Sequence, residues 1–355
     1  MLCDSKQQMQ EAPPLLDALS RVGEDSVARA RIVSALLEHE KHPDRRFTNI
    51  RDEVTGPLVD ALHASAGVVR KRLSNGLLFE FRYRSKIARD FVMSSPEEPD
   101  HVWEPQTTRL LLHLAHAGGD AIVGGAYFGD QAVALADALR GSGTCHAFEP
   151  DPGQAAMLER NATLNRLDNL VVEHRALWSE DGAALRLVGS DAYARTAPSD
   201  HGIATVSIAA YVREAGIARL GLIMLDLEGS ELAVLKGAEA VLRRDMPAIV
   251  FEIHRAYVDW SHGLGETEIV RLLAGFGYTI FAVRDFQSNV DMSGRPIELV
   301  PLESAYLKGP PHGFNLVAVG DPGLLRGDQF RLSPGVSPKL LFHRDPALHH
   351  PAGGL

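Results

Sequence analysis

The fold of this chain is decided by residues 222–238, which read LIMLDLEGSELAVLKGA. The apolar opening predicts a buried strand over 220–225, and the run that follows has the spacing of a helix over 230–243. Two acids, Asp226 and Glu228, stand where the strand should end. Because residues i and i+2 of a strand point to the same side, both carboxylates are expected to face one space.

The same alternation of apolar runs and helical segments extends outward from this stretch, over most of the chain beyond residue 120. Strands that alternate with helices of this length indicate βαβ units and a mostly parallel sheet, so we predict an α/β fold. In such a sheet, ligands bind at the carboxyl ends of the strands, beside the point where the strand order reverses. The predicted strands cover 121–125, 144–148, 170–174, 220–225, 248–253, 278–283 and 314–319, and the helices cover 106–117, 129–140, 152–164, 208–215, 230–243 and 266–275.

The first 100 residues do not follow this pattern. Helical spacing over 14–41 is broken near Gly23, and two strand-like runs flank Asn75-Gly76, a strong signal for a short hairpin. We expect residues 1–100 to form a helical region and a hairpin that cap the site or mediate dimerisation. Residues 101–320 should form the main domain.

Three other segments lack periodicity. The polar excursions 179–202 and 285–313 interrupt the strand–helix alternation, and we expect them to cap a pocket. The Pro- and Gly-rich tail over 321–355 is expected to be loosely ordered.

Composition excludes several classes of protein. Hydrophobic residues make up 45% and charged residues 23% of the 355 residues, which are the proportions of a globular chain. The formal net charge of −10 argues against a nucleic-acid partner, because neutralising phosphates needs an excess of Lys and Arg. Two cysteines exclude a disulfide framework and favour a cytoplasmic location. Without a secretory signal pattern or an apolar stretch of ~20 residues, we expect no membrane association.

A glycine-rich turn follows the first predicted strand, where residues 124–130 read GGAYFGD. Glycines at such a turn let a ligand lie against the backbone, and the next helix presents its N–H groups there. The second strand ends in Glu149, 20 residues after Gly129, where an acid suits a ribose diol. A glycine turn followed by this acid predicts an adenosine-containing ligand. A side chain introduced at Gly129 is expected to occupy the space of that ligand.

The fourth and fifth strands carry the acids that point to chemistry. Asp226 and Glu228 follow one strand, and Glu252 and His254 end the other, so all four converge if the strands are neighbours. A plainer interpretation is that Glu228 and Glu231 only complement the positive N-terminus of the next helix.

These motifs together resemble the FkbM-type S-adenosylmethionine-dependent methyltransferases over about residues 100–320. The family's glycine turn corresponds to 125–129, its Phe-Glu-Pro to 148–150, and its Asp-x-Glu-Gly-x-Glu with Leu-Lys-Gly-Ala to 226–238. The resemblance implies a Rossmann-like, seven-stranded class I methyltransferase sheet with S-adenosyl-L-methionine as cofactor. It implies these cofactor-binding residues: Glu104, Gly125, Ala126, Tyr127, Gly129, Asp130, Glu149, Pro150 and Asp226. The chain departs from the family pattern at three positions. Val123 stands where the family usually has an acid, Tyr127 where it has Asn, and Met224 where it has a basic residue.

The implied reaction is O-methylation of a hydroxyl on a small molecule, a sugar or a natural-product intermediate. His254 is the candidate general base, because its ordinary pKa lies near neutrality, and Asp226 or Glu252 would orient it or replace it. We assign no metal ligand, but Asp226, Glu252 and His254 could instead hold Mg²⁺ together with an acceptor diol. An NAD-type oxidoreductase and a non-catalytic binding domain remain further alternatives, and a homodimer through 14–41 is a further expectation.

Overall fold

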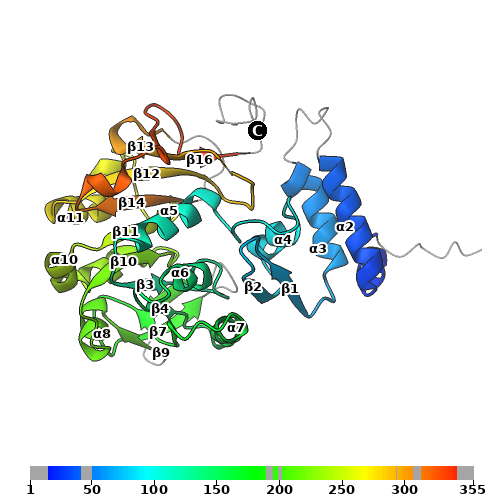
Figure 1. The fold of residues 1–355 in the computed structure, drawn as a ribbon, viewed down its shortest axis with the longest axis horizontal. Helices are drawn as coiled ribbons and strands as arrows, with labels where there is room; N and C mark the ends of the chain where they lie inside the picture. The colour runs from blue at the N-terminus through cyan, green and yellow to red at the C-terminus, as the bar shows by residue number, and fades with distance from the viewer. Residues whose placement is uncertain are drawn as a thin grey trace, which may run out of the picture.

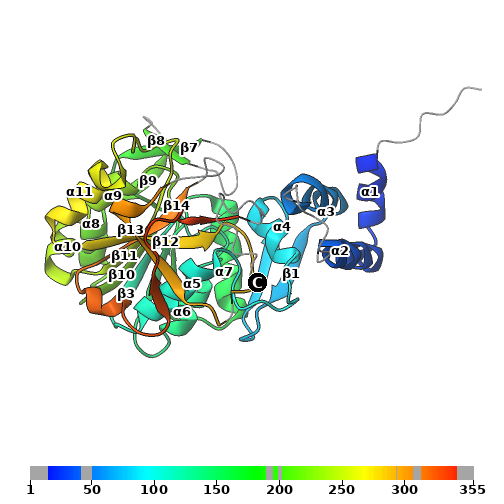
Figure 2. The same cartoon turned by 90° about the horizontal axis from the view of Figure 1, so that it is seen from above.

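The computed structural model describes residues 15–40, 50–188, 195–198, 202–292, 294–306 and 313–341. Figures 1 and 2 show a large sheet-containing body with the N-terminal helices at one side of it. The hairpin formed by β1 (Val68–Arg72) and β2 (Leu78–Arg82) lies between the two parts (Figure 1). No helix of the described residues is long and apolar enough to cross a membrane.

The central sheet has the strand order of a class I methyltransferase. The seven strands in sheet order are β5 (Leu170–Glu173), β4 (Cys145–Phe148), β3 (Asp120–Gly124), β10 (Leu220–Leu225), β11 (Ala248–Ile253), β14 (Phe314–Val319) and β12 (Thr279–Phe286). The first five are parallel, and β14 runs antiparallel between β11 and β12. The order reverses between β3 and β10, so a crevice is expected above these two strands. The predicted Rossmann-like α/β sheet is confirmed.

Helices cover both faces of this sheet and form two separate apolar cores. All residues of β10 and β11 are buried, as expected for central strands packed on both sides. One face packs on α5 (Pro105–Ala115), α6 (Ala132–Ala138) and α7 (Pro152–Leu164). The other face packs on α8 (Ile208–Glu214), α9 (Glu231–Lys236), α10 (Glu239–Asp245) and α11 (Glu268–Gly275).

The helix predicted over 230–243 is in fact two helices, α9 and α10, separated at Gly237. A Cβ at Gly237 would lie 2.6 Å from the Trp178 carbonyl oxygen, so the chain at 178–179 passes too close for any side chain. The Gly237 carbonyl also accepts a hydrogen bond from Ala209 N at 3.1 Å. Tertiary contact therefore breaks a helix that local periodicity would continue.

The segment 179–202 is also more ordered than its composition predicts. Together with its neighbours it forms a small sheet in the order β6 (Ala176–Leu177), β9 (Ile203–Val206), β7 (Ala184–Val188) and β8 (Arg195–Pro198). Leu177 and Val206 anchor this sheet in the second core. Its described residues contribute nothing to the cavity described below, so the expectation that this segment caps the pocket is wrong for them.

The tail expected to be loosely ordered is held at the edge of the main sheet as far as residue 341. After a 3₁₀ turn, η5 (Pro322–Leu325), the strand β15 (Phe330–Leu332) pairs with β13 (Ile297–Pro301), which itself pairs with β12. The short strand β16 (Lys339–Leu340) pairs with the far end of β12. Composition could not predict this, because the free edges of β12 and β13 supply the hydrogen bonds. Residues 342–355 lie outside the described part.

The N-terminal region contains the predicted helices and hairpin. These are α1 (Leu15–Gly23), α2 (Ser26–Glu40), a π-helical turn η1 (Arg51–Thr55), α3 (Gly56–Leu62) and α4 (Lys86–Val92), besides β1 and β2. The helices share a small core around Val33, Val59, Leu62 and Met93. Leu15, Leu16 and Val27 stay exposed, and the homodimer through this face stays a prediction.

Asn161 of α7 and Asn165, the C-cap of that helix, attach the hairpin to the main domain. Asn165 Oδ1 accepts from Leu78 N at 2.8 Å and its Nδ2 donates to Leu78 O at 2.7 Å. Asn161 makes the same pair of bonds to Glu80, at 2.7 and 2.9 Å, and also donates to Phe128 O at 2.8 Å. Four residues along a helix and two along a strand both span about 6–7 Å, so the two amides match the free edge of β2. The hairpin therefore holds a defined position beside the sheet.

Candidate functional site

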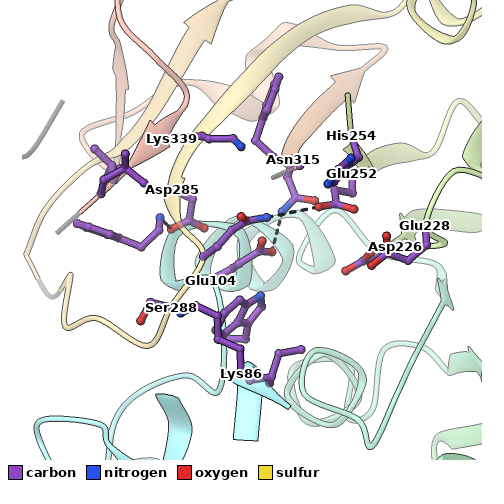
Figure 3. Close-up of a pocket in the computed structure, with 18 of the residues that line it drawn as sticks. Lys86, Glu104, Asp226, Glu228, Glu252, His254, Asp285, Ser288, Asn315 and Lys339 are labelled. Atoms are coloured by element: carbon purple, nitrogen blue, oxygen red, sulfur yellow. Dashed lines mark hydrogen bonds between the residues drawn. The ribbon is translucent and has the colours of Figure 1, made fainter. Parts of the chain in front are cut away.

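A cavity of about 230 Å³ lies at the carboxyl ends of β10 and β11, where a Rossmann-like sheet binds its ligands (Figure 3). Side chains enter it from the sheet, from the N-terminal region and from the C-terminal strand β16. The segment 285–313 contributes Asp285, Phe286, Gln287, Ser288 and Gly313 to its wall. The ionisable residues around it are Asp52, Glu104, Asp226, Glu228, Glu252 and Asp285, with Lys86, His254 and Lys339.

Three of the four predicted strand-end residues form a tight carboxylate group. Leu225 of β10 pairs with Phe251 of β11, so the next residues, Asp226 and Glu252, stand side by side. With Glu228 they place carboxylate oxygens all within 4.8 Å of one another. Burial, followed by the negative charge of neighbouring carboxylates, raises the pKa of Asp226 and of Glu252 well above the ordinary range. Convergence of these strand ends is what the i, i+2 pattern predicted.

Glu228 and Glu231 have different environments despite their shared motif. Glu228 has a left-handed backbone, with φ of 50°, and its side chain borders the cavity. Glu231 Oε1 instead accepts from Leu227 N at 2.7 Å and from Gly229 N at 3.4 Å. Glu231 thus stabilises the turn before α9, in line with the plainer interpretation, whereas Glu228 faces the ligand space.

His254 borders the cavity, but its Nδ1 lone pair is already used. It accepts a hydrogen bond from Ala256 N at 2.9 Å, which leaves the proton of the neutral ring on Nε2. The ring packs against Tyr257, with centroids 5.2 Å apart. A neutral histidine in this state has a donor at Nε2 and no free acceptor nitrogen. Its assignment as general base stays a prediction, and the neighbouring carboxylates are better placed to take a proton.

Sequence reasoning missed Asp285 and Lys339 because no local pattern marks them. Asp285 on β12 accepts from Gln106 N at 3.1 Å and Thr107 N at 2.7 Å, and so caps the N-terminus of α5 from across the fold. Lys339 enters from β16, and burial lowers the pKa of its ammonium group to about 8. Both depend on strand pairings between residues far apart in the chain.

Asn315 was also missed, although a polar residue in the apolar strand FNLVAV was a usable signal. Its side chain is only 3% exposed. Its Nδ2 donates to Glu104 Oε2 at 2.7 Å and to Thr107 Oγ1 at 3.2 Å, while its Oδ1 is buried with no hydrogen-bond partner. Burial also raises the pKa of the Glu104 carboxyl well above its usual range, with Asp285 and Asp226 adding to the shift.

The glycine turn lies beside this cavity and encloses a smaller one of about 10 Å³. Gly125, Ala126 and Asp130 border it, together with Glu104 and Asp226. Gly125 has φ of 76°, and a Cβ there would lie 1.9 Å from the Asp226 carbonyl oxygen, so the turn packs directly on the loop after β10.

Gly129 corrects one expectation. Its φ is 99°, and a Cβ would meet Leu158 Cδ1 at 2.6 Å and Val133 Cγ2 at 2.7 Å. Both atoms belong to the apolar core, and not to the ligand space. A side chain at Gly129 would therefore disrupt packing between α6 and α7, so a substitution there does not report on cofactor binding alone.

Glu149 ends up at the carboxyl end of β4, as predicted, and is 8% exposed. Its two oxygens accept from Tyr127 N and Asp151 N, each at 2.8 Å. Burial raises the pKa of the Glu149 carboxyl to about 7, against the opposing effect of these two hydrogen bonds. The carboxylate thus links the glycine turn to the start of α7, which Pro150 precedes and Asp151 caps.

Tyr127, which replaces the family's usual Asn, keeps the left-handed backbone of the turn with φ of 49°. Asn tolerates this conformation better than Tyr, so the Tyr side chain must be held by its surroundings. Its ring packs on Phe128 at 4.8 Å, and its hydroxyl bonds Ser85 Oγ at 3.1 Å. The substitution therefore ties the glycine turn to the N-terminal region.

The residues present fit the cofactor that the resemblance implies. S-adenosylmethionine combines a ribose diol with a sulfonium and an amino group, which are both cationic. Glu149 offers a carboxylate at the strand end where a diol is expected, and Glu104, Asp130 and Asp226 surround the glycine-lined cavity with carboxyl groups. Trp103, Glu104 and Asp226 border both cavities, so their movement would join them into one space. The cofactor assignments themselves stay predictions.

Part of this chain matches a known domain family. Residues 124–280 match the methyltransferase FkbM domain family, a narrower range than the resemblance over 100–320. The 31-O-demethyl-FK506 methyltransferase FkbM of Streptomyces tacrolimicus is 29% identical over 177 residues, which cover 40% of this chain and 66% of that protein, just under two thirds.

Solved structures of methyltransferases are similar at a lower level. Methyltransferase FkbM from Methylobacillus flagellatus KT is 14% identical with a TM-score of 0.35, covering 82% of this chain and 60% of that one. The O-methyltransferase from Bacillus cereus in complex with SAH is 13% identical with a TM-score of 0.36, covering 61% and 81%. At these scores the fold assignment rests on the strand order instead. Residues 124–280 thus match the methyltransferase FkbM domain family, within a sheet that has the strand order of a class I methyltransferase.

Proposed function

We propose that this protein transfers a methyl group from S-adenosylmethionine to a hydroxyl oxygen of a small-molecule acceptor. The observation that carries the proposal is the junction of two cavities at the reversal of strand order, one lined by the glycine turn and the other by strand-end carboxylates. The relative from Streptomyces tacrolimicus is named for methylation of an O-demethyl compound, which supports an oxygen acceptor and a natural-product substrate.

When bound, the cofactor supplies a methyl group that its sulfonium already activates, so the protein mainly has to bind and align. Glu149 would hold the ribose through its carboxylate oxygens. Asp130 and Glu104 would face the cationic methionine end, because both border the glycine-lined cavity. The larger cavity would then hold the acceptor.

The acceptor hydroxyl must lose a proton as its oxygen forms the new bond to carbon. Asp226 and Glu252 border the cavity that would hold the acceptor, and burial raises the pKa of both, so an ionised member of the pair is a stronger base than an ordinary carboxylate. We assign proton acceptance to this pair. The bound cofactor would supply the methyl group, and Asp226 or Glu252 would hold the proton that the acceptor hydroxyl loses.

Equilibrium binding tests this proposal against the NAD-type alternative. Calorimetry with the demethylated cofactor S-adenosylhomocysteine should show one site per chain, whereas NAD should show no saturable binding. The glycine turn supports this expectation, since Gly125 and Gly129 do not have the spacing of the dinucleotide motif. Saturable NAD binding without S-adenosylhomocysteine binding would reverse the assignment. Methyl transfer is then measured with matched acceptors that carry a hydroxyl or its methyl ether, and only the hydroxyl should react.

A further inference from the structure

The carboxylate group after β10 and β11 has more negative charge around it than the protein compensates. The larger cavity is bordered by six carboxylates and two lysines, Lys86 and Lys339. Lys86 Nζ lies 2.5 Å from Asp90 and 3.3 Å from Asp52, and Lys339 interacts electrostatically with Glu252, so these two lysines offset only part of the six carboxylates. Asp226, Glu228 and Glu252 meanwhile hold their oxygens within 4.8 Å of one another. Buried charges in proteins are normally paired or coordinate a metal.

Asn315 provides a second and independent observation at the same place. It is the direct cross-strand partner of Glu252 between β14 and β11, so the two side chains share one face of the sheet. Figure 3 shows the Asn315 amide beside the Glu252 carboxylate. Its Nδ2 is used by Glu104 and Thr107, and its Oδ1 remains without a donor at 3% exposure. A buried amide oxygen with no donor costs about 1–3 kcal/mol unless something satisfies it, and a cation would do so.

We propose that Asp226, Glu228, Glu252 and the Asn315 amide oxygen form a binding site for an oxygen-preferring divalent cation. All four ligands are oxygens, the donor set that suits Mg²⁺, Ca²⁺ and Mn²⁺ and not the soft metals. Two oxygens on one ion can be separated by at most twice the metal–oxygen distance, about 4.2 Å for Mg²⁺ and about 4.6–5.2 Å for Ca²⁺. The three carboxylates, whose oxygens lie within 4.8 Å of one another, therefore accommodate the larger ions directly and Mg²⁺ after a small rotation of a side chain.

This ligand set differs from the metal-binding alternative drawn from the sequence. That alternative combined Asp226 and Glu252 with His254, whereas His254 already accepts from Ala256 N and stands outside the carboxylate group. Glu228 takes its place, and Asn315 adds a neutral ligand. Four protein ligands leave coordination positions open toward the cavity, since these ions take six or more oxygens.

The role of the ion rests on the proposed methyl transfer. In the acceptor half of the cavity, the open positions would bind two neighbouring oxygens of the acceptor. The ion would thus select a vicinal diol or a hydroxy ketone over an isolated alcohol. It would also make the bound hydroxyl easier to deprotonate, as metal coordination does for water, and the proton would pass to the carboxylate oxygen of Asp226 or Glu252 that does not bind the ion.

Metal binding is tested on the full chain with Mn²⁺ alone. The protein is stripped with a chelator and titrated with Mn²⁺, and binding is followed by the loss of the free-ion electron paramagnetic resonance signal and by calorimetry. One site per chain is expected, with competition by Mg²⁺ and Ca²⁺. Glu252→Gln and Asp226→Asn should each weaken Mn²⁺ binding at least about tenfold, because even outer partners of metal ligands are worth 10–100-fold.

Asn315 variants make the test specific to this ligand set. Asn315→Leu should weaken Mn²⁺ binding about tenfold, whereas Asn315→Asp, which keeps an oxygen at the site and adds charge, should bind at least as tightly as the unaltered chain. Asp52→Asn is the matched control. Asp52 borders the same cavity but pairs with Arg89 at 2.8 Å, so its loss should change the affinity for Mn²⁺ less than about twofold. Thermal melts of every variant identify any that fail to fold.

The outcomes separate this inference from the proposed function. Absence of stoichiometric Mn²⁺ binding, or binding that only Asp52→Asn weakens, overturns the metal site. If S-adenosylhomocysteine still binds in the presence of chelator, the proposed function stands without the metal. If Mn²⁺ binds as expected and S-adenosylhomocysteine does not bind at all, the metal site stands and the methyl-transfer proposal falls.

Discussion

The carboxyl end of β4 and the carboxyl ends of β10 and β11 present acids in opposite ways. Glu149 is a single carboxylate whose two oxygens each accept from a backbone N–H. Asp226, Glu228 and Glu252 crowd together, and the Gln287 amide, 3.4 Å from Glu252, is a distant donor. The comparison indicates that a strand end sets the position of an acidic side chain, while the hydrogen-bond donors around it determine what the carboxylate can bind. A carboxylate held among N–H donors suits neutral hydroxyls, and a crowded group suits a proton or a cation.

The largest expected effect comes from the crowded strand ends. Asp226→Asn removes the charge next to Glu252 with little change in shape, and should lower kcat by about 10²–10⁴, the usual worth of a group that takes a proton. Affinity for S-adenosylhomocysteine should change far less. Rapid-quench turnover with a radiolabelled methyl group, together with calorimetry, measures both.

His254→Ala is the companion to this variant, and it sharpens the assignment within the same region. Because the His254 Nδ1 is occupied by Ala256 N, its removal should cost less turnover than Asp226→Asn. If His254→Ala is inactive and Asp226→Asn is active, the general base is His254.

The second effect concerns the strand end of β4. Glu149→Ala should weaken binding of S-adenosylhomocysteine by about 1.5–3 kcal/mol, the range for hydrogen bonds to a charged group. Turnover at saturating cofactor should change little, in contrast to Asp226→Asn. Calorimetry measures the affinity, and an unchanged value would remove Glu149 from the cofactor site.

The third effect tests the glycine turn that joins the two regions. Gly129→Ala should lower the free energy of unfolding by about 1–3 kcal/mol, because its Cβ would overpack against Leu158 and Val133 and its φ is positive. Chemical denaturation measures this loss. If the variant is as stable as the unaltered chain but no longer binds S-adenosylhomocysteine, the side chain enters the ligand space after all.

The sequence predicted the sheet well because its strands are buried apolar runs with a helix between all but the last pair. Strands 220–225, 248–253 and 314–319 agree with the structure residue for residue. Contacts between segments far apart in the chain were not predictable. The close approach of Trp178 to Gly237, which separates α9 from α10, and the pairing of β16 with β12 are both contacts of this kind.

The candidate site was predictable to the same extent. Asp226, Glu228 and Glu252 follow from the end of an apolar run and the i, i+2 rule. Asn315 comes beside Glu252 only through the antiparallel pairing of β14 with β11, and Lys339 only through β16. The hydrogen bond that occupies His254 is also a property of the folded loop, which no spacing in the sequence could reveal.

The smallest expected effect is a pH dependence that separates Glu149 from the other acids. Its pKa lies at about 7 because burial disfavours the charged form, with Asp151 and Asp130 adding negative charge nearby. Ribose hydroxyls donate to the ionised carboxylate, so cofactor binding should lower this pKa and affinity should fall as the pH drops below about 7. Between pH 8 and pH 6 the dissociation constant should rise about tenfold, as proton linkage requires for a single group.

Folding stability should respond to the same group with the opposite sign. A carboxyl whose folded pKa is raised from 4.5 to about 7 contributes stability below about pH 4.5, and this contribution is lost as the pH rises toward 7. In Glu149→Gln, the part of the pH dependence of affinity and of stability that comes from this carboxyl should vanish. Asp130 and Glu231 still titrate in that variant, because burial raises the pKa of each to about 7. Calorimetric affinities and denaturation midpoints at pH 6, 7 and 8, compared between the unaltered chain and Glu149→Gln, isolate the difference. An affinity that falls equally in both chains would assign the pH dependence to another acid, such as Asp130 beside the glycine turn.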